Sequence, residues 1–279
     1  MKQSEPSGNS STLRWWLAWA VHFYTGTGLL AAAGIAVLLT GSAPGPNDYR
    51  RAFILMLIAT CVDATDGTLA RWVDVKHVVP GFDGRRLDDL IDFLTYTCLP
   101  LLLIWRAEIV PVGQSAWLLV PLMASAYGFC QVSAKTEDGF FLGFPSYWNL
   151  VAFYLYLLHP PEWLSLGLIL FLAGMTFVPC RYLYPTHRGR LNRLTLQLGV
   201  VWAIFPIWIL ANLSSENFPA ETPASQSVRT AVLLSMMYPE YYLALSWIIS
   251  LRIWQRARRE AALRRSRLAS EDSTQVDVR

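Results

Sequence analysis

The chain has 279 residues, of which 54% are hydrophobic and only 15% are charged, with a formal net charge of +3. Soluble domains usually carry about 25% charged residues. A single soluble core of this size cannot cover repeated apolar stretches of about 20 residues. The composition therefore excludes an ordinary soluble domain and indicates an integral membrane protein.

Eight apolar stretches follow one another, and each is long enough, or nearly so, to cross a membrane as a helix. They cover residues 18–40, 50–71, 86–105, 115–133, 144–159, 163–182, 194–212 and 230–254. The first is too long for the apolar core of a signal peptide, so we interpret it as a retained span. The predicted fold class is an all-α integral membrane protein with about eight transmembrane helices.

The predicted organisation has three parts. Residues 1–14 form a disordered N-terminal tail, residues 15–255 a membrane-embedded catalytic domain, and residues 256–279 a basic C-terminal tail. The basic sequence RIWQRARREAALRRSR suits contact with anionic lipid headgroups, or it only fixes the topology on a solvated helix. The four cysteines form no CxxC pair, and we interpret them as small apolar packing residues.

The distribution of lysine and arginine predicts the orientation of the chain. With a cytoplasmic N-terminus and eight alternating spans, 19 of the 23 basic residues fall on the cytoplasmic side and 4 on the outer side. Cytoplasmic loops of membrane proteins carry such an excess. We therefore expect both termini in the cytoplasm.

Seven of the eleven aspartates lie between residues 61 and 92, partly inside apolar segments. Asp63 and Asp66 are three residues apart and share a helix face, as do Asp88 and Asp92, which are four apart. The short connection between the two segments predicts antiparallel neighbouring helices, so the four carboxylates can converge near the cytoplasmic surface. The other aspartates of this region are expected to lie in the loop or on a wet helix face.

Four converging carboxylates repel one another and need a compensating charge. Mg²⁺ and Mn²⁺ fit best, because they are hard ions that prefer oxygen ligands. Gly67 and Gly84 would let a ligand approach the backbone, and Arg71 would reach phosphate at the rim. Two alternatives stay open from spacing alone: a proton relay in a transporter, or a salt-bridge network with nearby arginines.

Two blocks of this region resemble the signature of the membrane CDP-alcohol phosphatidyltransferases, Asp-x2-Asp-Gly-x2-Ala-Arg followed by Gly-x3-Asp-x3-Asp. The chain carries DATDGTLAR at 63–71 and GRRLDDLID at 84–92, which match all eight defined positions. The spacer of twelve residues is longer than in most members and is typical of one branch, the bacterial phosphatidylcholine synthases. Residues 130–157 and 177–185 resemble further segments of that branch.

The resemblance implies a fold, a reaction and a location. The family has a six-helix core, to which this chain would add two helices, and its members are homodimers. The branch transfers a phosphatidyl group from CDP-diacylglycerol to choline, which gives phosphatidylcholine and CMP, with Mn²⁺ or Mg²⁺. The reaction takes place among membrane lipids at the cytoplasmic face of the bacterial inner membrane. We expect no nucleic-acid partner.

The resemblance also implies roles by position. Asp63, Asp66 and Asp88 would be metal ligands, and Asp92 the general base with a further contact to metal. The nucleotide and pyrophosphate pocket would be lined by Asp63, Gly67, Ala70, Arg71, Gly84 and Asp88.

A choline site needs aromatic faces, often with a carboxylate nearby. One segment of 14 residues on the expected cytoplasmic side supplies both, and its candidates are Glu137, Phe141, Tyr147, Trp148 and Asn149. The alternative is that these aromatic residues only mark a membrane interface.

Two other functions are weighed against this one. A sister enzyme would use serine, inositol or glycerol phosphate, and a phosphorylated acceptor would want a basic pocket. A carboxylate-lined ion or proton transporter would show carboxylates in several spans. Here the later spans have almost none near their centres.

Overall fold

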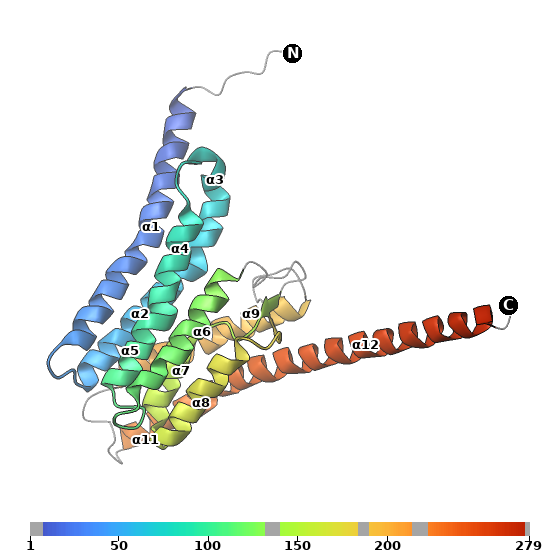
Figure 1. The fold of residues 1–279 in the computed structure, drawn as a ribbon. Coiled ribbons are helices and arrows are strands. Elements are labelled where there is room, and N and C mark those ends of the chain that lie inside the picture. Colours follow the sequence, from blue (N-terminus) through green and yellow to red (C-terminus); the bar gives the residue numbers. More distant parts are fainter. Residues whose placement is uncertain (1–7, 132–139, 184–189, 214–222, 277–279) are drawn as a thin grey trace.

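A computed structural model describes residues 8–131, 140–183, 190–213 and 223–276. Nearly all of these residues are helical, and Figure 1 labels most of the elements. The first helices are α1 (Gly8–Thr40), α2 (Pro46–Val73), the short α3 (Val75–Val78), α4 (Gly84–Asp92), the π-helical η1 (Phe93–Cys98) and α5 (Leu99–Arg106). The middle of the chain holds η2 (Ser115–Leu118), α6 (Leu119–Cys130), α7 (Trp148–Leu158) and α8 (Glu162–Met175). The last helices are α9 (Arg190–Trp202), α10 (Ile204–Asn212), α11 (Pro223–Ser235) and α12 (Met237–Val276).

Four helical segments of the described chain are long and apolar enough to cross a membrane: Thr12–Thr40, Pro46–Val73, Leu191–Asn212 and Gln226–Ala261. Three shorter apolar helices are Ser115–Cys130, Trp148–Leu158 and Glu162–Met175. The all-α integral membrane class is therefore confirmed. The count of eight spans stays a prediction.

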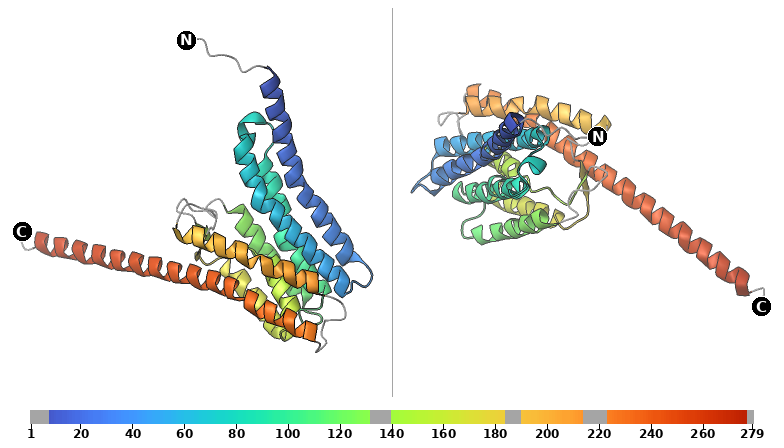
Figure 2. Two further views of the ribbon diagram at one scale, coloured as in Figure 1. Left: turned by 180° about the vertical axis from the view of Figure 1, so that it is seen from behind. Right: turned by 90° about the horizontal axis from the view of Figure 1, so that it is seen from above.

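The helices α1 and α2 run antiparallel and form a long hairpin (Figures 1 and 2). At the end of α2 the chain turns through α3, and α4, η1 and α5 continue one another back alongside the hairpin. The helix α1 packs against both α2 and α4. This arrangement confirms the antiparallel neighbours expected from the short connection, and it brings Asp63 of the first aspartate pair close to Asp88 and Asp92.

Two predicted boundaries differ from the helix ends. Helix α1 already begins at Gly8, so residues 8–14 are helical where we expected a disordered tail. Helix α12 continues to Val276 and extends far beyond the bundle, so the expected basic tail is the outer half of a long helix (Figure 2).

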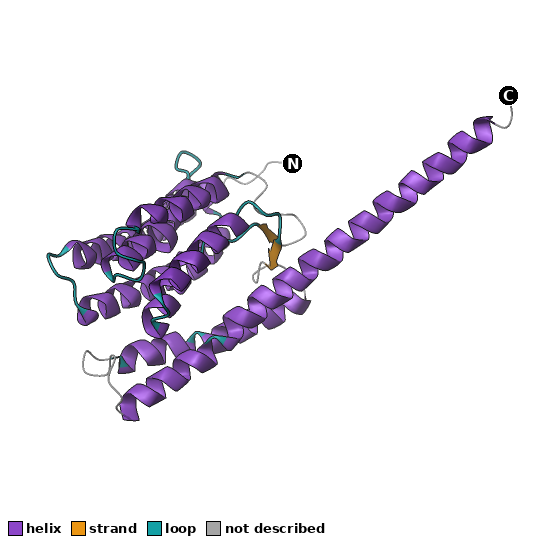
Figure 3. Cartoon of the chain, turned by 60° about the horizontal axis from the view of Figure 1, so that its bottom comes forward, coloured by secondary structure: helices purple, strands orange, loops and turns teal. Residues whose placement is uncertain are grey.

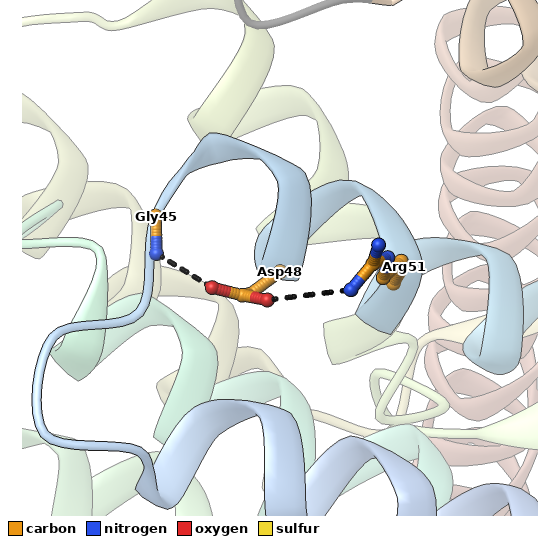
Figure 4. A network of polar contacts seen from close by, with 3 residues as sticks. All are labelled: Gly45, Asp48 and Arg51. Atoms are coloured by element: carbon orange, nitrogen blue, oxygen red, sulfur yellow. Dashed lines mark hydrogen bonds and ion pairs between the residues drawn. The ribbon is translucent and has the colours of Figure 1, made fainter.

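Polar caps hold together the end of the bundle that lies opposite the aspartates. The backbone N–H of Gly45 donates to Asp48 Oδ2 at 3.0 Å, and the carboxylate of Asp48 lies 3.9 Å from Arg51 (Figure 4). The Asp48 carboxylate thus accepts from an N–H at the positive end of α2. At the same end, Arg50 and Arg106 donate to backbone carbonyls of Leu210 and Gly41, at 2.6 and 2.7 Å.

The only strands among the described residues are β1 (Phe140–Leu142) and β2 (Arg181–Leu183), an antiparallel pair that lies beside α12 (Figure 3). Ser250 accepts from the N–H of Arg181 at 2.6 Å, and Ser246 accepts from the N–H of Leu183 at 3.2 Å. Both serine side chains are buried. Because unpaired backbone groups are costly in an apolar setting, these serines fix α12 along β2.

Candidate active site

Three carboxylates meet between α2 and the helix that follows the turn. Asp63, Asp88 and Asp92 each place one oxygen within 4.8 Å of the oxygens of the other two, and all three residues are half-buried. Asp88 and Asp92 lie one turn apart on α4, and the α2–α3–α4 turn sets their face opposite Asp63. The predicted convergence is therefore present for three of the four aspartates.

The donor set of this triad fits a hard divalent cation. Its three oxygens come from partly dehydrated carboxylates, and such groups repel one another unless a positive charge lies between them. Magnesium and manganese are bound by oxygen ligands of this kind, often with substrate phosphates completing the coordination.

Asp66 does not join the triad. Its side chain is 4% exposed, and it accepts a hydrogen bond of 2.8 Å from the Thr25 hydroxyl of α1. A separation of three residues rotates the side chain by about 60° around the helix axis, which turns Asp66 toward α1 while Asp63 points at α4. The expectation that all four carboxylates converge is thus wrong for Asp66 in this structure.

The rim of the site on α2 is open. Arg71 is exposed, and its guanidinium donates to Thr68 at 3.0 Å. A Cβ atom on Gly67 would meet only the guanidinium of Arg71, at 3.4 Å. Ala70 is half-buried. The absence of a Cβ atom at Gly67 therefore leaves space above the backbone on this side of α2, and the approach of a ligand there stays a prediction.

The packing of α1 gives one reason for a glycine at position 84. A Cβ atom there would lie 2.5 Å from Cε1 of His22, which packs from α1. The His22 ring is 6% exposed and stands 4.5 Å from the Phe82 ring, centroid to centroid. The glycine at position 84 therefore lets the His22 ring of α1 pack close to the backbone, and its place in the nucleotide pocket stays a prediction.

The remaining aspartates of the region hold the turn. Asp74 has a left-handed backbone with φ of 59° and contacts His77 at 2.6 Å. Asp83 caps α4, since its carboxylate accepts from the N–H of Arg86 at 3.2 Å. Asp89 is half-buried and, like the other two, lies outside the triad. Asp74 and Asp83 thus lie in the turn, as expected, and all three aspartates lie outside the triad.

The choline candidates separate into three groups. Glu137 lies outside the described residues. The side chain of Trp148 is fully buried, and its indole N–H donates to Ser125 at 2.7 Å, which favours a packing role over a place in a ligand wall. Phe141 and Tyr147 are half-buried, and Asn149 donates to Thr60 on α2 at 3.3 Å.

One residue of the site was missed by the sequence analysis. The Tyr96 hydroxyl donates to Asp63 Oδ2 at 2.7 Å. Its ring centroid lies 6.4 Å from that of Tyr147. The helical spacing would have found it, because Tyr96 follows Asp92 by four residues and Asp88 by eight.

Comparison with known proteins gives a consistent result. No family model matches the chain. It is 33% identical over 245 residues to a phosphatidylcholine synthase of Pseudomonas aeruginosa, which covers 86% of this chain and 92% of that protein. A phosphatidylcholine synthase of Legionella pneumophila is 35% identical over 84% of this chain and 89% of its own length. One of Legionella bozemanae is 32% identical over 72% and 91%.

The contact between Gly84 and His22 gives a first prediction. We expect Gly84→Ala to lower the melting temperature of the purified protein, because overpacking costs about 1–3 kcal/mol. His22→Ala in the same chain should restore much of the loss, since it removes the clashing ring. Gly26→Ala is the control, because nothing lies within 4 Å of a Cβ at that position. A double variant as unstable as Gly84→Ala alone would refute the packing explanation.

Proposed function

The chain belongs to the phosphatidylcholine synthase family, and from this membership we propose that it transfers the phosphatidyl group of CDP-diacylglycerol to choline. The products are phosphatidylcholine and CMP. The observation that carries the proposal is the 33% identity to a phosphatidylcholine synthase over 92% of that protein. The carboxylate triad supports it, because it offers the donors that a divalent-metal phosphatidyl transfer needs.

We propose that Asp63, Asp88 and Asp92 hold Mg²⁺ or Mn²⁺. A divalent ion bound there supplies positive charge that stabilises the pyrophosphate and the leaving CMP. The family motif assigns Asp66 to the same ligand set, but its buried bond to Thr25 favours a supporting role between α1 and α2.

Asp92 is the proposed general base. Its carboxylate takes the proton of the choline hydroxyl. The hydroxyl oxygen then forms a bond to the phosphorus that carries diacylglycerol. The bond from that phosphorus to the bridging oxygen breaks, and the electron pair leaves with CMP.

The nucleotide would lie along the open rim of α2. Gly67 and Ala70 present little side chain there, and Arg71 is exposed on the same turn. A guanidinium suits phosphate oxygens because it offers paired donors. We propose that Gly84 contributes indirectly, by letting α1 and the α3–α4 turn come close.

The setting of the enzyme is also a proposal. The lysine and arginine bias supports a multi-pass protein of the bacterial inner membrane with the site and both termini in the cytoplasm. We further propose a homodimer, as the family resemblance implies. Within the choline site, Phe141, Tyr147 and Asn149 stay candidates, and Glu137 stays a prediction.

A panel of acceptors tests the activity. Purified protein with CDP-diacylglycerol and Mn²⁺ should convert labelled choline to phosphatidylcholine and release CMP. Serine, inositol and glycerol phosphate should give little or no lipid product. Efficient use of one of these in place of choline would establish the sister activity instead, and no lipid product with any acceptor would refute the transferase.

The proposed metal site gives a prediction about aspartate substitutions. Asp63→Ala and Asp88→Ala should abolish turnover and weaken Mn²⁺ binding measured by electron paramagnetic resonance, because each removes one oxygen ligand. Asp74→Ala and Asp83→Ala are the controls and should keep both. Full activity in excess chelator would contradict the metal mechanism. Asp66→Asn should keep Mn²⁺ binding, because we propose that Asp66 links α2 to α1 and is not a metal ligand.

The base is tested separately. We expect Asp92→Asn to lose turnover while CMP and CDP-diacylglycerol still bind, because the amide cannot take a proton but leaves the pocket in place. Nucleotide binding is measured by equilibrium dialysis with labelled CMP. Loss of nucleotide binding together with turnover would contradict the base role and leave Asp92 as a metal ligand or a structural residue only.

A further inference from the structure

We infer that Tyr96 serves this reaction through both of its parts: the hydroxyl fixes the Asp63 carboxylate, and the ring forms with Tyr147 the aromatic face for the trimethylammonium group of choline. The inference rests on the proposed function. Tyr96 lies outside the two motif blocks, which end at Arg71 and Asp92.

The hydroxyl part follows from a contact within the triad. Tyr96 donates to Asp63 Oδ2 at 2.7 Å across 33 residues of sequence. A hydrogen bond to one carboxylate oxygen fixes the rotation of the group, so the second oxygen keeps a defined direction. Tyr96 is thereby a positioning residue for Asp63.

The backbone that carries Tyr96 is unusual. It belongs to the π-helical segment η1, between the α-helical segments α4 and α5. Segments of this type often occur at functional sites, because their wider turn re-aims side chains. Thr95 and Thr97 on either side are buried, so this segment is packed into the bundle while the Tyr96 hydroxyl reaches Asp63 on α2.

The ring part follows from the size of choline. Only two carbons separate its hydroxyl from its nitrogen, so the ammonium must lie close to the carboxylates whenever the hydroxyl reaches the base. Its aromatic partner must therefore adjoin the triad. Tyr96 does, whereas Trp148 is buried and bonded to Ser125.

Tyr96 is also the first ring of a row. Its centroid lies 6.4 Å from that of Tyr147 at the start of α7, with 53° between the planes. Tyr147 lies 6.4 Å from Tyr242 of α12, with 56° between the planes. Quaternary ammonium groups bind to such groups of aromatic faces, and the adjacent carboxylates add favourable charge.

Two substitutions separate the two parts. Tyr96→Phe keeps the ring and removes the hydroxyl, so we expect kcat to fall about tenfold or more while the KM for choline stays within about twofold. Mn²⁺ binding, measured without substrates by electron paramagnetic resonance, should weaken because Asp63 is no longer held. Tyr154→Phe is the matched control, since it also removes a tyrosine hydroxyl bond, of 2.9 Å to Ser235, away from the triad.

Tyr96→Leu also removes the ring. It should raise the KM for choline several-fold beyond the effect of Tyr96→Phe and leave that for CDP-diacylglycerol unchanged. The second readout is competition by the neutral isostere of choline, in which a tert-butyl group replaces trimethylammonium. Wild type and Tyr96→Phe should prefer choline, and Tyr96→Leu should lose most of that preference, because the cation–π attraction is gone.

The outcomes are distinct. Wild-type kcat and Mn²⁺ binding in Tyr96→Phe would overturn the hydroxyl part. Unchanged choline discrimination in Tyr96→Leu would overturn the ring part, as would an equal rise in both Michaelis constants. A wild-type enzyme that does not use choline in the acceptor panel would instead refute the proposed function itself.

Discussion

The free-energy cost of placing carboxylates in an apolar helical bundle determines which groups surround the aspartates of α2 and α4. A charged group in low dielectric must be paired or hydrogen-bonded, and the structure meets that demand differently at neighbouring positions. The Thr25 hydroxyl of α1 satisfies Asp66, and the Tyr96 hydroxyl of η1 satisfies one oxygen of Asp63. The triad leaves a concentration of negative charge that a divalent cation can balance. Two aspartates of α2 therefore form hydrogen bonds with neighbouring helices, Asp66 with α1 and Asp63 with η1, in addition to the apolar packing of α2.

The same demand applies to the backbone far from the triad. In the strand β2, the N–H groups of Arg181 and Leu183 face α12, where Ser250 and Ser246 accept from them. Tyr242, one turn earlier on α12, donates to the Leu183 carbonyl at 2.9 Å. This row of polar side chains on one face of α12 fixes the end of the tyrosine row that begins at Tyr96. The carboxylate site is thus connected through side chains to the last helix of the chain.

Much of the site was predictable from spacing, and its limits are physical. Residues three or four apart share a helix face, so the sequence could bring Asp63 to Asp88 and Asp92. Spacing does not say which neighbouring helix meets a face, so it could not place Asp66 against Thr25 or His22 against Gly84. The spacing from Asp88 and Asp92 points to Tyr96, but no periodic signal predicts that the turn which carries it is π-helical. The many aromatic residues around Trp148 predicted contact with a ligand. Whether a ring faces a ligand or the core depends on its burial, which the sequence does not give, and Trp148 is fully buried.

The arrangement also separates the chemistry from the choice of acceptor. The motif residues lie on α2 and α4, and the roles proposed for them, namely charge compensation, a base and room for the nucleotide, are ones that any phosphatidyl transfer from a CDP-lipid requires. The tyrosines that we propose to distinguish choline from other alcohols come from elements outside the motif, namely η1, the start of α7 and α12. Only two carbons separate the hydroxyl of choline from its nitrogen, so the residues that bind the ammonium group must lie next to the triad. The π-helical turn accomplishes this, because it carries Tyr96 from the helix of the base to the carboxylate of the opposite helix.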